Sequence, residues 1–262
     1  KSNENMGLAE EFLIIEHLCH IYREKRIPYK KNGTIGALCV SNILRITNTD
    51  PIQHDIPYEM AISFDGSQVP TFYIEHGDHW FVTLKHNKQL NPLKDVLYPG
   101  KTLENDIAFS NASAWDYIMS EDYICIFDMD EGMLKEIIAL YEPRSIISLT
   151  NVFSMVQSTG VYERNAEELV RQGVVKIQDC PATREDIFNI LMENGIEKNI
   201  ACTITSSVSK GRGVPPRYTE MIKKMDLPSW FIPYCNKIQY MFPRSHCVEE
   251  AIIAYKAAFA ML

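Results

Sequence analysis

Apolar residues recur at helical spacing through much of the chain, most regularly in its second half. Near the start, apolar side chains at positions 8, 12, 15, 18, 19 and 22 fall on one face of residues 7–26 when these are wound as a helix. The pattern predicts an amphipathic helix, and Ile27-Pro28-Tyr29 breaks it, because proline does not continue a helix.

The next hundred residues have a different pattern of apolar and polar positions. Short apolar runs separated by turn residues such as Asp65-Gly66 predict strands or extended pieces. These are residues 54–64, 69–74, 80–84 and 123–127. Residues 86–122 carry Asn, Pro, Gly, Asp and Ser throughout, with apolar anchors at positions 97, 98, 115, 117 and 118, and their pattern does not distinguish one type of element from another.

From residue 131 onward the pattern predicts a run of short helices. They are residues 131–142, 166–172, 184–194, 197–209, 217–225, 228–241 and 246–262. Asn165 is a predicted N-cap, Thr183 and Asp186 have capping-box spacing, and Gly173 and Gly195 are predicted C-terminal stops. The predicted fold class is α+β, mostly α, with a shortened α/β region over 1–132 and a helical domain over 133–262.

The composition bears on the cellular compartment of the protein and on the partners that it can bind. The chain has 262 residues, 46% of them hydrophobic, and this supports a globular core. No apolar run is long enough for a membrane span and the N-terminus is polar, so we expect a cytoplasmic protein without membrane contact. The chain stops at Leu262 inside an apolar helical pattern, which favours a longer natural protein or a truncated relative.

The net charge of -8 opposes general attraction to nucleic acid. Acidic residues dominate the first 140 positions, whereas residues 210–244 are the densest basic segment. Any contact with nucleic acid must therefore be local and C-terminal, and the alternative interpretation of this segment is a solvated charged face.

Metal and nucleophile patterns are weak. The seven cysteines are odd in number and lack CxxC spacing, which argues against a disulfide framework and a zinc cage. Residues 75–79 with His86 gather His, Glu and Asp around Gly77, and we interpret them as a polar turn. His246 and Cys247 are sequence neighbours, whose side chains diverge on a helix, so no catalytic dyad is predicted. No metal site is predicted.

Several stretches in order carry a family resemblance. They are YEPRS (141–145), SLTNVFSMVQSTGVYERNAEELV (148–170), REDIFNILMENGIEKNIA (184–201), SVSKGRG (207–213) and PSWFIPYCNKIQYMFPRSH (228–246). The last is the most specific, because KIQYMFPRSH resembles the family signature Lys-Ile-Lys-Tyr-Met-Phe-Pro-Lys-Ala-His. Residues 133–262 thus resemble the fingers region of PolC-type DNA polymerase III alpha subunits.

The first half is similar to the palm of the same family in shorter pieces. GTIGALCVSNILRIT (33–47) resembles the palm loop, and the candidates there are Gly33, Thr34 and Gly36. HDIPYEMAISFDGSQVP (54–70) resembles the segment that leads to the catalytic aspartates. The resemblance implies an Asp-x-Asp pair for two Mg²⁺ ions after Pro70, but Thr71, Phe72 and Tyr73 stand there. Two-metal catalysis needs carboxylates, and these side chains cannot supply them.

Further departures concern nucleotide contacts. Asp128 is a weak candidate for the third catalytic aspartate, although its place in the alignment puts it at the entrance to the fingers. The family's Ser-His-Gly-Thr-Asp-Val-Trp, which faces nucleotide or template, corresponds to residues 156–162, with Gln157 at the His position. A family Tyr after the signature His corresponds to Glu250, which adds a negative charge.

Other basic positions are kept or changed conservatively, and the resemblance makes them candidates for phosphate contact. They are Lys210, Arg212, Arg244, His246 and Lys256. Their alternative interpretation is surface charge and, for His246, a helix cap. The aromatic residues Trp230, Phe231, Tyr234, Tyr240 and Phe242 are predicted to pack in the core rather than to stack on bases.

The leading hypothesis is a catalytically inactive, shortened PolC homologue that binds primer–template DNA, single-stranded DNA or a replication protein. One alternative is an active DNA polymerase or nucleotidyltransferase component, with Asp128 as a catalytic residue. The other is a pure protein-interaction module. No cofactor is expected, and Mg²⁺ would be needed only if the polymerase alternative holds.

Overall fold

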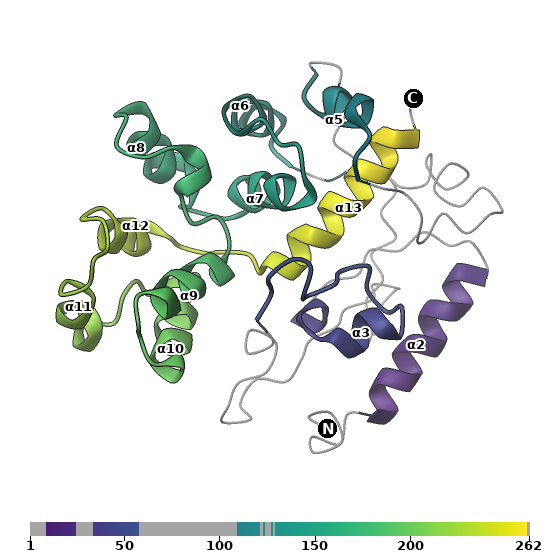
Figure 1. The fold of residues 1–262 in the computed structure, drawn as a ribbon, viewed down its shortest axis with the longest axis horizontal. Helices are drawn as coiled ribbons and strands as arrows, with labels where there is room; N and C mark the ends of the chain where they lie inside the picture. The colour runs from purple at the N-terminus through teal and green to yellow at the C-terminus, as the bar shows by residue number, and fades with distance from the viewer. Residues whose placement is uncertain are drawn as a thin grey trace.

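The computed structural model describes residues 9–24, 34–57, 109–120, 123, 127 and 129–260. In these ranges the regular structure is helical, with one isolated antiparallel bridge between Thr159 and Tyr240 (Figure 1). Among the same residues, no helix is both long and apolar enough to cross a membrane. The prediction of a mostly α fold is confirmed.

The elements follow one another as short helices joined by tight loops. In order they are α2 (Ala9–Glu24), η1 (Thr34–Ala37), α3 (Cys39–Ile43), α5 (Ala112–Ile118), α6 (Glu131–Tyr141), α7 (Ile146–Gln157), η4 (Tyr162–Ala166), α8 (Glu167–Arg171), η5 (Ile177–Asp179), α9 (Arg184–Glu193), α10 (Lys198–Ser209), α11 (Pro216–Ile222), α12 (Phe231–Lys237) and α13 (Arg244–Ala260).

Local sequence starts and ends several of these helices. Asp130 caps α6 by accepting a 2.7 Å hydrogen bond from the backbone N–H of Met133. The carboxylate of Asp186 accepts from the backbone N–H of Thr183 at 2.6 Å, so the predicted capping interaction at the start of α9 is confirmed. Gly173 and Gly195 adopt φ values of 68° and 80°, as the predicted C-terminal stops require.

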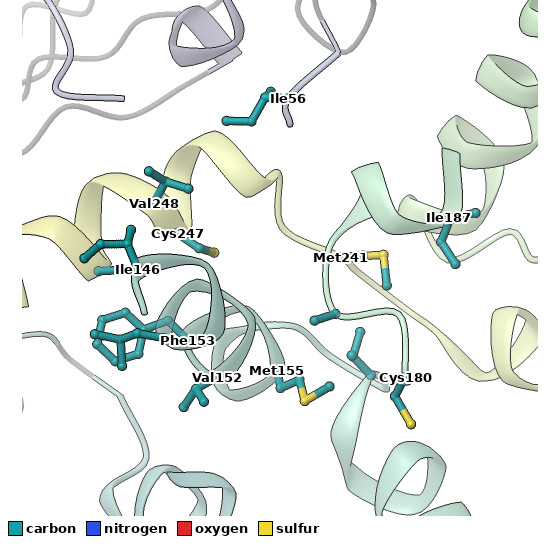
Figure 2. Packing of buried hydrophobic residues seen from close by; sticks show 14 of the residues in the cluster. Ile56, Ile146, Val152, Phe153, Met155, Cys180, Ile187, Met241, Cys247 and Val248 are labelled. Atoms are coloured by element: carbon teal, nitrogen blue, oxygen red, sulfur yellow. The ribbon is translucent and has the colours of Figure 1, made fainter. Parts of the chain in front are cut away.

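Helix α13 is the centre of the core. It packs most extensively on α7, and it also contacts α5 and η1. Figure 2 shows Cys247 of α13 facing the side chains of α7, with Met241 lying between α7 and α9. Residues such as Phe153, Cys247 and Val248 have no exposed surface. Burial of apolar surface on this scale is the main stabilising contribution to the fold.

Segments from the first half of the chain join the same core. The ideal Cβ of an alanine at Gly36 would lie 2.9 Å from the Cβ of Ser245, so η1 sits directly against the start of α13. Nearer the other end of α13, the hydroxyl of Tyr255 accepts a 2.9 Å hydrogen bond from the backbone N–H of Asn111, which caps α5. The described residues on both sides of the predicted boundary thus contribute to one core. The boundary itself stays a prediction.

Two local predictions are wrong. The helix predicted over 228–241 is shorter, because α12 ends at Lys237 and the following backbone pairs with Thr159 instead of continuing the helix. Asn165 does not cap α8. Its side-chain amide donates to the carbonyls of Gly160 and Tyr234 at 2.8 and 3.1 Å. Long-range hydrogen bonds replace the predicted local ones in both cases.

The α/β part of the prediction is not tested by these residues. Residues 58–108 hold most of the predicted strands and lie outside the described part of the chain. The described residues Tyr123 and Phe127 of the last predicted strand are buried but do not form a strand. The palm-like α/β region therefore stays a prediction.

Candidate nucleic-acid interface

The most specific stretch of resemblance contains an extended segment, residues 238–243, which we call the strap. The backbone N–H of Thr159 donates to the carbonyl of Tyr240 at 2.9 Å. The carbonyl of Thr159 accepts from the backbone N–H of Tyr240 at 3.1 Å and from that of Gln239 at 2.9 Å. Met241 donates to the carbonyl of Ser209 at 3.1 Å. The strap is therefore fixed between the loop after α7 and the end of α10.

Glycines allow the loops to approach the strap this closely. Gly160 has φ of 74°, and an added Cβ would lie 2.5 Å from the carbonyl oxygen of Lys237. Gly211 has φ of 74°, and an added Cβ would lie 2.4 Å from the carbonyl oxygen of Gln239. Both the left-handed backbone and the contact exclude a larger side chain. SVSKGRG is thus placed against the strap by its first glycine.

Lys210 and Arg212 flank Gly211 and are exposed. Neither side chain forms an ion pair or a hydrogen bond with any residue that the structure describes. Because Gly211 touches the strap, both cations arise from backbone next to Gln239 and Tyr240, which are also exposed. Of the predicted phosphate-contact residues, Lys210 and Arg212 are therefore accessible to a ligand.

Arg244 has a different environment. Its side chain is only 7% exposed. The guanidinium donates to the carbonyls of His54 and Asp55 at 3.1 and 2.6 Å, to the Thr183 hydroxyl at 3.4 Å, and to the Asp186 carboxylate. The nearby carboxylates of Asp186 and Glu185 raise its pKa against the opposing effect of burial. This geometry favours a structural role for Arg244 over phosphate contact.

His246 and Glu250 form a second buried contact. The Nε2 atom of His246 lies 3.4 Å from Glu250 Oε1, and the imidazole packs on Phe242 with ring centroids 5.0 Å apart. Glu250 has no exposed surface and accepts a hydrogen bond from the side-chain amide of Gln157. Two positions at which the sequence departs from the family pattern, 157 and 250, therefore contact each other.

The remaining candidates are spread apart. Lys256 is half-buried on α13, twelve residues beyond Arg244, which corresponds to about 18 Å along the helix axis. Phe231 and Tyr234 are buried as predicted, whereas Tyr240 is 47% exposed, so the predicted core role does not hold for that residue. Its ring meets Phe242 edge-on, with centroids 5.0 Å apart.

The structure describes two of the three palm-loop candidates. Gly36 is buried against Ser245, between the buried side chains of Ile35 and Ala37, which is the packing of a core turn. Thr34 begins η1, and Gly33 lies outside the described residues, as do Asp128 and Thr71–Tyr73. Where the structure describes the chain, no three His, Cys, Asp or Glu side chains gather as a metal site would require.

Sequence reasoning missed the residues that hold residues 48–55 to α13. Glu249 is 3% exposed and accepts from the backbone N–H of Thr49 at 3.1 Å, from its hydroxyl at 3.2 Å, and from Asn48. Burial lowers the pKa of His54, and Arg244 adds to this effect, while Asp50 and Glu249 oppose it. Glu249 is adjacent to the predicted site, yet nothing in its local sequence distinguishes it from a surface glutamate.

Comparison with known proteins supports the family resemblance. The sequence model of the family described as bacterial DNA polymerase III alpha NTPase domain matches residues 2–79. PolC-type DNA polymerase III from Caldanaerobacter subterraneus is 32% identical over 126 residues, or 48% of this chain. The PolC-type DNA polymerases III from Thermotoga petrophila and from Pediococcus pentosaceus are 32% and 33% identical over 128 residues, or 49% of this chain.

The matched part covers 9% of the length of each of these three relatives. The resemblance to PolC-type DNA polymerase III is confirmed, and the chain is a PolC-related homologue. Because the chain corresponds to so small a share of those proteins, their activity as a whole does not transfer to it.

Proposed function

We propose that this chain is a catalytically inactive homologue of PolC-type DNA polymerase III that binds DNA through Lys210 and Arg212. The observation that carries the proposal is the contrast between the two sets of family positions. Gln157 and Glu250, which correspond to nucleotide-facing positions, are paired with each other, whereas Lys210 and Arg212 stay exposed beside the strap. Scaffold and DNA contact can persist after chemistry is lost, because a fold does not by itself specify a function.

The proposed loss of catalysis rests on the donor set. A two-metal site holds Mg²⁺ with carboxylate oxygens, and Thr71, Phe72 and Tyr73 contain none. These residues do not fit the ions that the family resemblance implies. A buried carboxylate at position 250 adds to this argument, because it places negative charge where the family resemblance implies a nucleotide contact.

The proposed DNA contact is local and electrostatic. Two exposed cations without a partner among the described residues can each replace a counterion on a phosphate, and the net charge of -8 keeps the affinity modest and sensitive to salt. The rigid strap behind them limits the conformational entropy that the loop loses on binding.

The test is fluorescence anisotropy with labelled primer–template DNA across a series of salt concentrations. Lys210→Ala combined with Arg212→Ala should weaken binding and reduce the slope of log K against log salt by up to about 2. Lys135→Ala combined with Lys224→Ala is the matched control, because it removes two exposed cations elsewhere in the chain. Equal effects of the two double variants, or no binding at low salt, would reject the proposed DNA contact.

Catalysis needs a separate measurement. Purified chain, primer–template, deoxynucleotides and Mg²⁺ should give no primer extension. Magnesium-dependent extension would overturn the proposal of inactivity, and its loss in Asp128→Asn would instead support the alternative of an active polymerase component.

A further inference from the structure

A groove lies on a part of the molecule that the proposed DNA contact does not use. It has a volume of about 890 Å³ and lies between the ends of α6, α8 and α9, the η5 turn and the start of α12. Its apolar walls are Leu140, Val174, Ile190, Leu227, Trp230 and Phe231. No residue of the 210–213 loop or the strap lines it.

Two of the apolar side chains in this groove are unusually accessible. Val174 is 51% exposed and Leu140 is 42% exposed, and both belong to the few large apolar side chains that are exposed in the described ranges. Two such residues in one groove differ from isolated surface apolar residues, which are common and need no explanation. The groove volume lies within the range of ligand sites in proteins.

Trp230 supplies a second and independent observation. Its indole packs edge-on against Tyr234, with ring centroids 5.8 Å apart, and remains half-buried. The indole N–H donates no hydrogen bond to the residues that the structure describes. Tryptophan is enriched at protein interfaces because it combines a large apolar area with one polar donor, and it is frequent among the residues that contribute most to binding.

The charges around the groove select the kind of partner. Asp179 and Glu193 line it, and neither carboxylate is paired with a described residue. Lys176 is the basic residue of the lining and is exposed. The two carboxylates outnumber the ammonium, and the chain as a whole has a net charge of -8. Both the local and the overall charge favour a basic partner and oppose a phosphate-bearing one.

A hydrogen-bonded side chain ties together two of the elements that line the groove. The side-chain amide of Gln178 donates to the carbonyls of Leu140 and Tyr141, at 3.4 and 3.2 Å, and so ties η5 to the end of α6. Gly173, which ends α8 with φ of 68°, has nothing within 4 Å of the position a Cβ would take. A wall fixed in this way loses little entropy when a partner binds.

We propose that this groove binds a protein segment that presents an apolar face flanked by Lys or Arg side chains. The apolar face contacts Val174 and Trp230, and the basic side chains pair with Asp179 and Glu193. This is a protein-binding surface in addition to the proposed DNA contact, and it does not depend on that contact.

The test uses the full chain and two fluorescently labelled helical peptides of about 16 residues. One repeats Leu and Lys in an amphipathic pattern, and the other has Glu in place of every Lys. Anisotropy should show the Leu/Lys peptide binding at least about tenfold more tightly than the Leu/Glu peptide. Absence of binding, or equal binding of the two peptides, would overturn the proposal.

Variants separate the groove from general attraction to an acidic protein. Val174→Glu should weaken binding of the Leu/Lys peptide at least about tenfold, while Ile147→Glu, a change at a 38% exposed side chain on α7 outside the groove, should leave it unchanged. Asp179→Asn with Glu193→Gln should weaken it more than Glu163→Gln with Glu220→Gln, which removes equal charge elsewhere. Circular dichroism checks folding, and equal effects within either pair would reject the groove.

Discussion

Arg244 lies in a buried hydrogen-bond network, whereas Lys210 and Arg212 lie exposed at the end of α10. All three cations belong to the same region of family resemblance. Arg244 is buried and its guanidinium is hydrogen-bonded to Thr183, Asp186 and backbone carbonyls. Lys210 and Arg212 are exposed beside the strap. The first cation contributes to the fold, and the other two are available to a ligand.

The difference teaches that a basic residue at a position of family resemblance is not by itself a phosphate ligand. A buried cation must be paired, and removing it leaves its partners buried without compensation. An exposed cation can be removed with little effect on the free energy of unfolding, and its removal should change the affinity for a ligand instead. Stability and binding measurements should therefore separate the two regions.

The largest expected effect is on the Arg244 network. Arg244→Ala removes the donor that joins the carbonyls of residues 54 and 55 to Asp186, and it should lower the free energy of unfolding by about 3–5 kcal/mol. Urea denaturation measures this. Lys210→Ala is the control and should change the free energy by less than about 0.5 kcal/mol. Similar losses in the two variants would contradict the assigned difference.

The next effect concerns the packing of the loop after α7 on the strap. Gly160→Ala forces a Cβ to within 2.5 Å of the Lys237 carbonyl oxygen at a positive φ, and it should cost about 3 kcal/mol. Gly173→Ala has a similar φ and open space, so it should cost only about 1 kcal/mol. Urea denaturation of both variants compares them, and equal costs would mean that close packing on the strap is unimportant.

A smaller effect is expected at Glu249. Glu249→Gln replaces a charged acceptor of the Asn48 and Thr49 hydrogen bonds by a neutral one, and it should cost about 1.5 kcal/mol. Amide hydrogen exchange should become faster at Asn48 and Thr49 as well. The exposed Glu220→Gln variant should show neither change, and unaltered exchange at Thr49 would argue against Glu249 as the anchor of this loop.

The smallest effect is a pH dependence from His54. Its pKa is lowered in the folded chain, chiefly by burial, so the unfolded chain binds the proton more readily. Stability should therefore decrease as the pH falls below about 6.5, by less than about 1.4 kcal/mol for each unit of the pKa difference. In His54→Gln this part of the pH dependence should disappear, whereas in the exposed His17→Gln it should remain. Denaturation at several pH values measures it.

The sequence alone determined the features that depend on neighbours in the chain. Helical periodicity predicted α6, α9, α10 and α13 within a few residues, and the spacing of Thr183 and Asp186 predicted a cap that the structure contains. The order of motifs was enough to recognise the PolC resemblance. Such signals are short-range, because caps and amphipathic faces are set by residues a turn or two apart.

Only the tertiary structure decided which polar residues are buried and which are free. Tyr240 lies outside α12 because Thr159, far away in sequence, supplies its hydrogen bonds. Arg244 and Arg212 look alike in the sequence, but Asp186 and the carbonyls of residues 54 and 55 surround only the first. Burial is the sum of contacts from segments distant in the chain, so no local pattern could separate a buried structural cation from an exposed one.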